Sequence, residues 1–162
     1  MTIATGLTLF RGVLIGPTVV AVLAGQNWLA LALFALAVFT DAVDGMVARS
    51  RNEVTTLGGL LDPVMDKLLY IGIFSALAAT DRLSFWGPVL YAIPQLGLGL
   101  GTLALWQRRK RLVAHWPGKG AAALTAVAAV ALLVTPWGEG PFWAAVAANF
   151  LAALYYLWRQ TS

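Results

Sequence analysis

The chain has 162 residues, enough for one domain, and its composition of 60% hydrophobic and 11% charged residues excludes an ordinary soluble domain, which carries about 25% charged residues. The absence of cysteine excludes disulfides, thiolate metal sites and a cysteine nucleophile. The net charge of +4 does not indicate nucleic acid binding, because the basic residues cluster between apolar stretches, as expected of membrane orientation and contact with anionic lipid headgroups.

Six apolar stretches have the length of membrane-spanning helices, which need about 20 apolar residues or somewhat fewer inside a bundle. In chain order they cover residues 7–24, 28–48, 57–79, 85–106, 119–134 and 142–158. The fifth is short and rich in Ala and Leu, so its ends are the least well defined. We therefore expect an all-α, polytopic membrane protein with six transmembrane helices, folded as a single domain of residues 1–162.

The distribution of basic residues predicts the orientation of these helices. The second and fourth connections, with the adjoining helix ends, carry Arg49, Arg51, Arg108, Arg109, Lys110, Arg111 and Lys119. The other connections carry only Arg82. Because cytoplasmic loops are enriched in Lys and Arg, the first group is predicted to be cytoplasmic. Both termini then face the cytoplasm, and we expect a multi-pass protein of the cell membrane.

Four aspartates lie close together within strongly hydrophobic sequence, at the end of the second predicted helix and the start of the third. They are Asp41, Asp44, Asp62 and Asp66. Spacings of three and four residues place each pair one helical turn apart on one face. Unpaired carboxylates beside hydrocarbon are costly, so stability does not explain the cluster. Oxygen ligands at this density favour a hard divalent cation such as Mg²⁺ or Mn²⁺.

The residues around the aspartates favour chemistry at phosphorus. Four facing carboxylates are suited to two metal ions about 4 Å apart, the arrangement used for in-line displacement at phosphorus. Gly45 and Gly58 lie on the same helix faces and allow a ligand to approach the backbone closely. Arg49 follows one turn after Gly45 and is suited to a phosphate or a nucleobase carbonyl. The predicted reaction is transfer at a pyrophosphate beside a membrane.

The pattern Asp41-x-x-Asp44-Gly45-x-x-Ala48-Arg49, followed after eight residues by Gly58-x-x-x-Asp62-x-x-x-Asp66, resembles the full motif of the CDP-alcohol phosphatidyltransferases. The resemblance implies that Asp41, Asp44, Asp62 and Asp66 bind two metal ions, with Asp66 also the catalytic base. It implies that Gly45, Ala48, Arg49 and Gly58 bind the CDP group. An acceptor hydroxyl would attack the β-phosphorus of a CDP-linked lipid and release CMP. Members of the family are typically homodimers.

Other segments resemble the phosphatidylglycerophosphate and cardiolipin synthase branch of that family. They are Thr55, the run Leu7-Thr8-Leu9-Phe10-Arg11, Asp66-Lys67 and Gly118-Lys119. By this resemblance Thr55 and Thr8 join the CDP-binding residues. The departures are Thr5 in place of the usual Asn, Gln95 in place of a frequent Arg, and Lys119-Gly120-Ala121-Ala122 in place of a Lys-x-Lys-Thr run. The favoured substrates are CDP-diacylglycerol and glycerol 3-phosphate, with phosphatidylglycerol, inositol phosphate or serine as alternative acceptors.

Four basic residues are candidates for binding the acceptor: Lys119, Arg108, Arg11 and Lys67. Lys119 is the better candidate because it opens a predicted helix, and the other three also have a simpler interpretation. The run that begins at Arg108 is typical of an orientation signal, Arg11 is also placed to extend to the membrane interface, and Lys67 is placed to pair with an aspartate.

Two other functions remain open on the residues alone. An intramembrane prenyltransferase also binds a diphosphate through aspartates, but it needs two distant Asp motifs and a chain nearly twice as long. A divalent-cation transporter would place its acidic residues near the bilayer midplane. Here the predicted acidic site lies at one membrane face.

Overall fold

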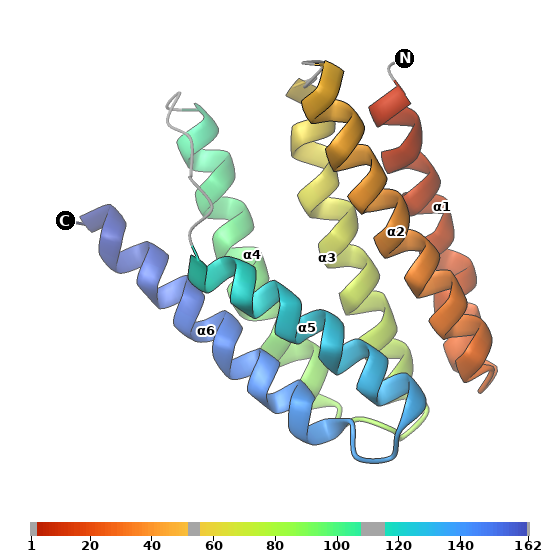
Figure 1. Ribbon diagram of the computed structural model, residues 1–162. Helices are drawn as coiled ribbons and strands as arrows, with labels where there is room; N and C mark the ends of the chain where they lie inside the picture. Colours follow the sequence, from red (N-terminus) through yellow and green to blue (C-terminus); the bar gives the residue numbers. More distant parts are fainter. Residues whose placement is uncertain (1–2, 52–55, 108–115, 162) are drawn as a thin grey trace. The chain divides into compact units, whose positions relative to one another are not determined.

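The computed structural model describes residues 3–51, 56–107 and 116–161, and all regular structure in these ranges is helical (Figure 1). The helices are α1 (Ile3–Leu23), α2 (Asn27–Arg51), α3 (Thr56–Ala79), α4 (Trp86–Gln107), α5 (Trp116–Val134) and α6 (Glu139–Thr161). The chain forms two compact units, Met1–Thr80 and Asp81–Ser162. We call them the N-terminal and C-terminal units and describe each by itself.

All six predicted helices are confirmed, and their ends differ from the predicted ends by a few residues. The largest differences are that α1, α5 and α6 begin three or four residues earlier, and α2 and α6 end three residues later, than hydropathy indicates. In α5 and α6 the added first turn contains Pro117 or Pro141. Proline is tolerated there because the first N–H groups of a helix have no partner within the helix. Hydropathy marks the apolar part of a helix, whereas its hydrogen bonds extend into less apolar sequence.

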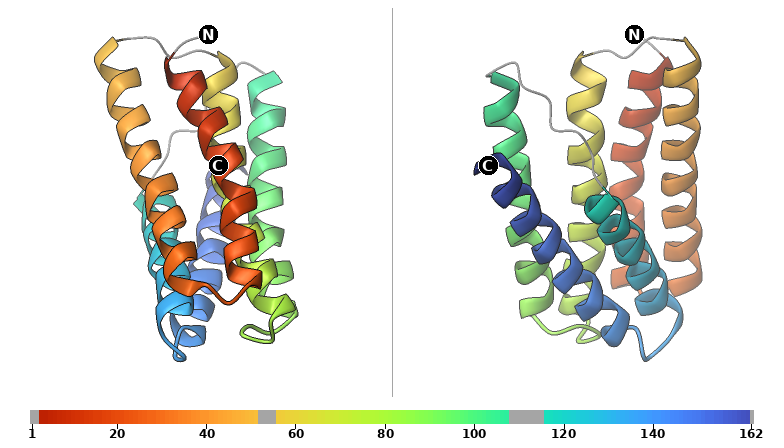
Figure 2. Two further views of the ribbon diagram at one scale, coloured as in Figure 1. Left: turned by 90° about the vertical axis from the view of Figure 1, so that its right-hand side faces the viewer. Right: turned by 60° about the vertical axis from the view of Figure 1, so that its left-hand side comes forward.

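The N-terminal unit is built around α1, which packs against both α2 and α3. Consecutive helices run in opposite directions, so the start of α1, the end of α2 and the start of α3 lie at the same end of the unit (Figures 1 and 2). We call this the motif end. Segments that are far apart in sequence are thereby brought together at the level of the aspartate motif.

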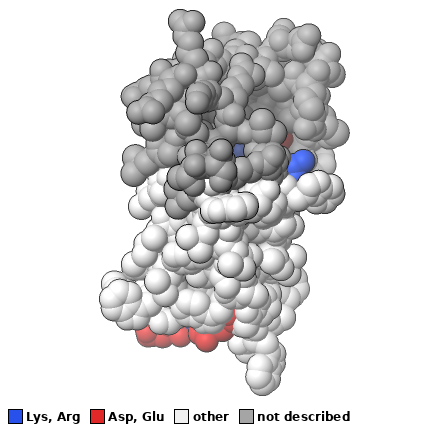
Figure 3. Space-filling view, turned by 90° about the vertical axis from the view of Figure 1, so that its left-hand side faces the viewer, with Lys and Arg blue, Asp and Glu red and all other residues white. Residues whose placement is uncertain are grey.

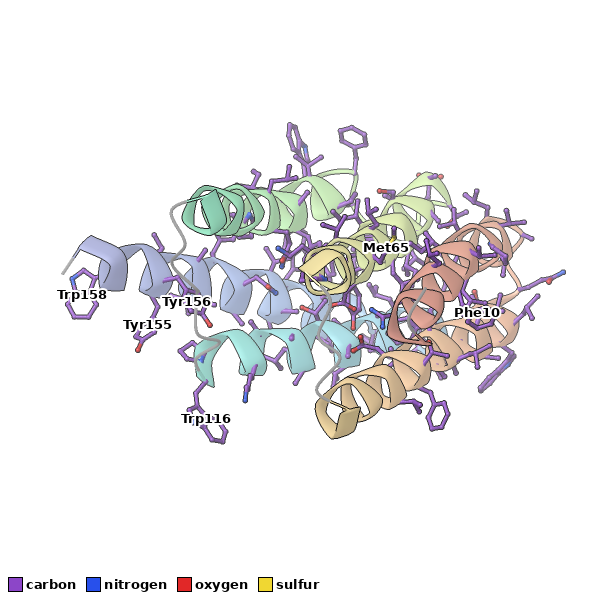
Figure 4. The ribbon with its side chains drawn as sticks, turned by 90° about the horizontal axis from the view of Figure 1, so that it is seen from above. Phe10, Met65, Trp116, Tyr155, Tyr156 and Trp158 are labelled. Carbon is purple, nitrogen blue, oxygen red and sulfur yellow. The ribbon has the colours of Figure 1, made fainter. Side chains whose placement is uncertain are left out.

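Small residues allow α1 and α3 to pack closely. A Cβ atom added to Gly72 would lie 2.9 Å from Val19 Cγ2, and one added to Gly12 would lie 3.3 Å from Met65 Sδ. Figure 4 shows Met65 on the side of α3 that faces α1. The glycines therefore set the distance between the two helices, near mid-length at Gly12 and farther from the motif end at Gly72.

The C-terminal unit is built around α6, which packs against α4 and α5. Its buried interior contains a polar network that joins all three helices. Gln95 Nε2 on α4 donates to Asn149 Oδ1 on α6 at 2.6 Å. Asn149 Nδ2 donates to Thr125 Oγ1 on α5 at 3.0 Å and to the Ala145 carbonyl at 2.8 Å. The Thr125 hydroxyl donates to the carbonyl of Ala121 at 2.8 Å. These hydrogen bonds compensate the burial of the polar groups in an otherwise apolar interior.

The helix surfaces are strongly apolar. Among the described residues, one helix, α5, is long and apolar enough to cross a membrane, and shorter apolar helical stretches cover Leu9–Leu23 and Asn27–Val43. Large apolar side chains are exposed along the described helices, and Trp116 and Trp158 point away from them (Figure 4). On the face shown in Figure 3, few described side chains are charged. Exposed apolar side chains in such number are typical of a surface that contacts lipid or another protein.

Candidate active site

Two of the four motif aspartates have described side chains, and both lie near the middle of their helices, ten residues from the motif end of the N-terminal unit. Asp41 belongs to the part of α2 that approaches this end, and Asp66 belongs to the first half of α3. The residue before Asp41 is the buried Thr40, whose hydroxyl donates to the Ala37 carbonyl at 2.8 Å. This bond within the helix satisfies a polar group that has no access to water. The carboxylate of Asp41 is then the first strongly polar group on α2 that is exposed, with 54% of its side-chain surface accessible.

Arg11 on α1 lies beside Asp41. Its Nη2 atom is 2.5 Å from Asp41 Oδ1, and only 1% of its side-chain surface is exposed. The side chain therefore does not extend to the surface, which was the alternative open on the sequence alone. A buried guanidinium is stable only beside negative charge or hydrogen-bond acceptors, and Asp41 supplies the negative charge.

Asp66 is partly buried and interacts electrostatically with Asp41, Arg11 and Lys67. Lys67, the next residue along α3, is also partly buried and interacts with Asp66. The structure thus brings together four predicted site residues from three helices: Arg11, Asp41, Asp66 and Lys67. Two carboxylates and two cations share one region, so each carboxylate has a positive group close to it.

Tyr70 lies one turn after Asp66 on α3 and was not among the predicted site residues. Its buried hydroxyl-bearing ring makes an edge-on contact with Phe34 of α2, with ring centroids 5.7 Å apart, and stacks with Phe74 at 6.1 Å. The phenol interacts electrostatically with Asp66 and Asp41. These aromatic rings separate the carboxylates from the apolar interior. The four-residue spacing from Asp66 to Tyr70 places both on one helix face and was the available sequence signal.

The remaining predicted residues are not tested by the side-chain geometry. The helical positions whose side chains lie outside the described set are Thr8, Asp44, Gly45, Ala48, Arg49, Gly58 and Asp62. Thr55 and Arg108 lie outside the described residues altogether. Lys119 is exposed in the first turn of α5. The helix begins three residues earlier, at Trp116, so Lys119 is not its first residue as predicted. Gln95, noted as a departure from the family pattern, donates to Asn149 within the C-terminal unit.

The donor chemistry of the two described aspartates fits a hard divalent cation. Asp41 and Asp66 offer carboxylate oxygens close enough to interact, and Asp41 is accessible. Among the described side chains no group of three or more His, Asp or Glu residues is positioned to hold a metal ion. The side chains of Asp44 and Asp62, the other two members of the predicted ligand set, lie outside the described set.

Comparison with known proteins places the chain among phospholipid-synthesising enzymes. The sequence profile of the CDP-alcohol phosphatidyltransferase family matches residues 1–157. The chain is 32% identical to a CDP-diacylglycerol–glycerol-3-phosphate 3-phosphatidyltransferase of Salmonella choleraesuis, over 96% of the chain and 89% of that protein. A protein of the same name from Escherichia coli K12 gives the same identity and coverage. A probable phosphatidylglycerophosphate synthase of Mycobacterium tuberculosis is 33% identical, over 94% of the chain and 74% of that protein.

Proposed function

The chain belongs to the CDP-alcohol phosphatidyltransferase family, and from this premise we propose that it transfers the phosphatidyl group of CDP-diacylglycerol to glycerol 3-phosphate. The products would be phosphatidylglycerophosphate and CMP. The observation that carries the proposal is the similarity, over almost the whole chain, to relatives named for this reaction. The proximity of Asp41 and Asp66 on facing helices supports it, because the reaction requires negatively charged ligands and a base at one place.

In the proposed mechanism, the acceptor hydroxyl attacks the β-phosphorus of the CDP-linked lipid. Asp66 accepts the proton of that hydroxyl as the new P–O bond forms. The bond between the β-phosphorus and the oxygen bridging to the α-phosphorus breaks, and CMP leaves with that oxygen. Partial burial of Asp66 beside Lys67 and Arg11 supports this role, because a base held away from bulk water and among fixed charges keeps its orientation toward the hydroxyl.

The carboxylates Asp41, Asp44, Asp62 and Asp66 would bind Mg²⁺ or Mn²⁺, as two ions in the full ligand set. The bound metal would offset the negative charge that develops on the diphosphate during transfer. The Asp41 side chain is exposed, so a metal ion can reach its carboxylate from outside the helix bundle. Arg11 holds this carboxylate from its buried side, which leaves the accessible side for a cation.

The other site residues follow from the motif. We propose that Gly45, Ala48, Arg49, Gly58, Thr55 and Thr8 bind the CDP group. Arg11, Lys67, Lys119 and Arg108 would supply positive charge for the phosphate of the acceptor. Two of these, Arg11 and Lys67, lie in the same unit as Asp66 and interact with it.

The proposal includes a membrane location. We propose that the six helices span the membrane of the cell as one domain, with the active site and both termini on the cytoplasmic side, and that the protein is a homodimer. The abundance of exposed apolar side chains supports insertion into lipid. Exposed tryptophans at or beside helix ends, such as Trp28, Trp86, Trp116 and Trp158, are typical of the membrane interface.

A product analysis tests the proposed reaction. Purified protein in detergent is incubated with CDP-diacylglycerol, Mg²⁺ and one acceptor at a time: glycerol 3-phosphate, phosphatidylglycerol, inositol phosphate or serine. Mass spectrometry of the lipid product and measurement of released CMP identify the acceptor. Phosphatidylglycerophosphate is the expected product. A different lipid product would show that the enzyme uses a different acceptor. Release of CMP without any new lipid would contradict the transferase function.

A further inference from the structure

Arg11 presents hydrogen-bond donors that nothing in the described part of the chain satisfies. The side chain is 1% exposed, and Nε, Nη1 and Nη2 are without a hydrogen-bond partner there. Nη2 contacts Asp41 Oδ1 at 2.5 Å but without the geometry of a hydrogen bond, so the contact is an ion pair. Buried polar groups in native proteins are almost always hydrogen-bonded. Within the described residues this guanidinium is a strong exception, because Nε and Nη1 have no partner and Nη2 has only the ion pair.

The position of this guanidinium restricts what it binds. Arg11 lies on the helix that packs against both α2 and α3, beside Asp41 and in electrostatic range of Asp66. The tight contact of the neighbouring Gly12 with Met65 fixes this part of α1 against α3. The free N–H groups therefore lie at the catalytic carboxylates, where the reaction has to place phosphate groups.

We propose that Arg11 is a phosphate-binding residue of the active site, whose unsatisfied N–H groups donate to oxygen atoms of a ligand phosphate beside Asp41. This inference rests on the proposed function, because it assigns the ligand within that same site. A planar guanidinium matches two phosphate oxygens at once, whereas an ammonium group does not. Asp41 holds the guanidinium from one side and keeps its own exposed surface for a cation. Arg11 and Asp41 together would thus hold a phosphate and the cation that accompanies it.

The phosphate has two sources in the proposed reaction: the diphosphate of the CDP-linked lipid and the phosphate of the acceptor. Their chemistry at Arg11 is the same, so separate binding measurements must distinguish them. CDP carries the diphosphate without the lipid, and cytidine is the matched ligand that lacks it. Glycerol 3-phosphate carries the acceptor phosphate, and glycerol is its matched control.

The experiment compares Arg11→Gln and Arg11→Lys with wild-type protein in detergent and Mg²⁺, by calorimetric binding of the four ligands and by steady-state KM values. The control variant is Arg82→Gln, because Arg82 in the C-terminal unit donates Nη2 to the Leu132 carbonyl at 2.6 Å, remote in sequence from the motif. Arg11→Gln is expected to weaken one phosphorylated ligand about 10- to 100-fold, the range for loss of a charge-assisted hydrogen bond. Binding of cytidine and glycerol should not change.

The pattern of losses identifies the phosphate. A weaker affinity for CDP with an unchanged KM for glycerol 3-phosphate assigns Arg11 to the diphosphate, and the reverse assigns it to the acceptor. Arg11→Lys keeps the positive charge beside Asp41, so it should recover the melting temperature but only part of the phosphate affinity. This variant decides the question if Arg11→Gln does not fold.

Wild-type affinity for CDP and wild-type KM for glycerol 3-phosphate in a folded Arg11 variant would overturn the proposal, because Arg11 would then be only a counter-ion of Asp41. A different result would refute the proposed function: wild-type protein that forms no phosphatidylglycerophosphate. The dependence of CDP binding on Arg11 would still test the phosphate contact in that case.

Discussion

Replacing Asn149 by Leu tests whether the buried polar network holds the C-terminal unit together. Asn149 accepts from Gln95 at 2.6 Å and donates to Thr125 at 3.0 Å and to the Ala145 carbonyl at 2.8 Å. Leucine has a similar volume and removes all three bonds. Thr125 still donates to Ala121, and the Ala145 carbonyl belongs to the α6 backbone. The main loss is therefore the interhelical bond that Asn149 Oδ1 accepts from the buried Gln95.

The expected cost follows from the loss of that one interhelical bond. The net contribution of a hydrogen bond to stability is about 0.5–1.5 kcal/mol. Interhelical hydrogen bonds in a helical membrane protein average about 0.6 kcal/mol and reach about 1.7 kcal/mol, which agrees with that range. At about 2–4 °C per kcal/mol for a chain of this length, the loss corresponds to roughly 1–6 °C in melting temperature.

The assay is thermal unfolding of the purified protein in detergent, followed by tryptophan fluorescence. The matched control is Thr18→Val, because Thr18 is equally buried but its hydroxyl donates to Leu14 within the same helix at 2.7 Å. Its melting temperature should change little. The double variant Gln95→Leu with Asn149→Leu removes both partners of the interhelical bond, so it should be more stable than the sum of the single effects predicts. A wild-type melting temperature for Asn149→Leu, or strict additivity, would refute the reasoning.

Three further predictions concern the active site and its orientation. Chelation of divalent metal should abolish activity and added Mg²⁺ or Mn²⁺ should restore it, and activity that resists chelator would contradict the metal assignment. Asp41→Ala should lose turnover and also lower the melting temperature, because it leaves the buried Arg11 without its counter-ion. Asp66→Asn keeps the shape of the side chain, so CDP affinity should survive while turnover falls about 10²–10⁴-fold, and near-normal turnover would exclude Asp66 as the base. Single cysteines at Ser50 and Ala114 should react with a membrane-impermeant thiol reagent only from the cytoplasmic side, and one at Glu139 only from the opposite side. Glu139 is preferred to its neighbour Gly138 because a Cβ atom at position 138 would lie 2.5 Å from the Leu132 backbone.

Local sequence was sufficient to predict the six helices and to identify the aspartate motif by its helical spacing. Hydrophobic stretches and the three- and four-residue spacing of aspartates both reflect the geometry of a single helix, which requires no knowledge of its neighbours. The antiparallel order of α1, α2 and α3 then explains why Asp41 and Asp66 interact. The sequence was less informative about helix starts, as at Pro117, because the first turn of a helix needs no apolar residues.

Tertiary structure decided which groups are paired and which are not. The sequence left it open whether Arg11 lies at the active site or extends to the membrane interface. Its contact with Asp41 depends on how α1 packs against α2. Tyr70 and the bond between Gln95 and Asn149, 54 residues apart, depend in the same way on neighbouring helices. Burial and hydrogen-bond partners are properties of several helices at once, so the sequence of one helix does not specify them, whereas helical periodicity is a property of each helix alone.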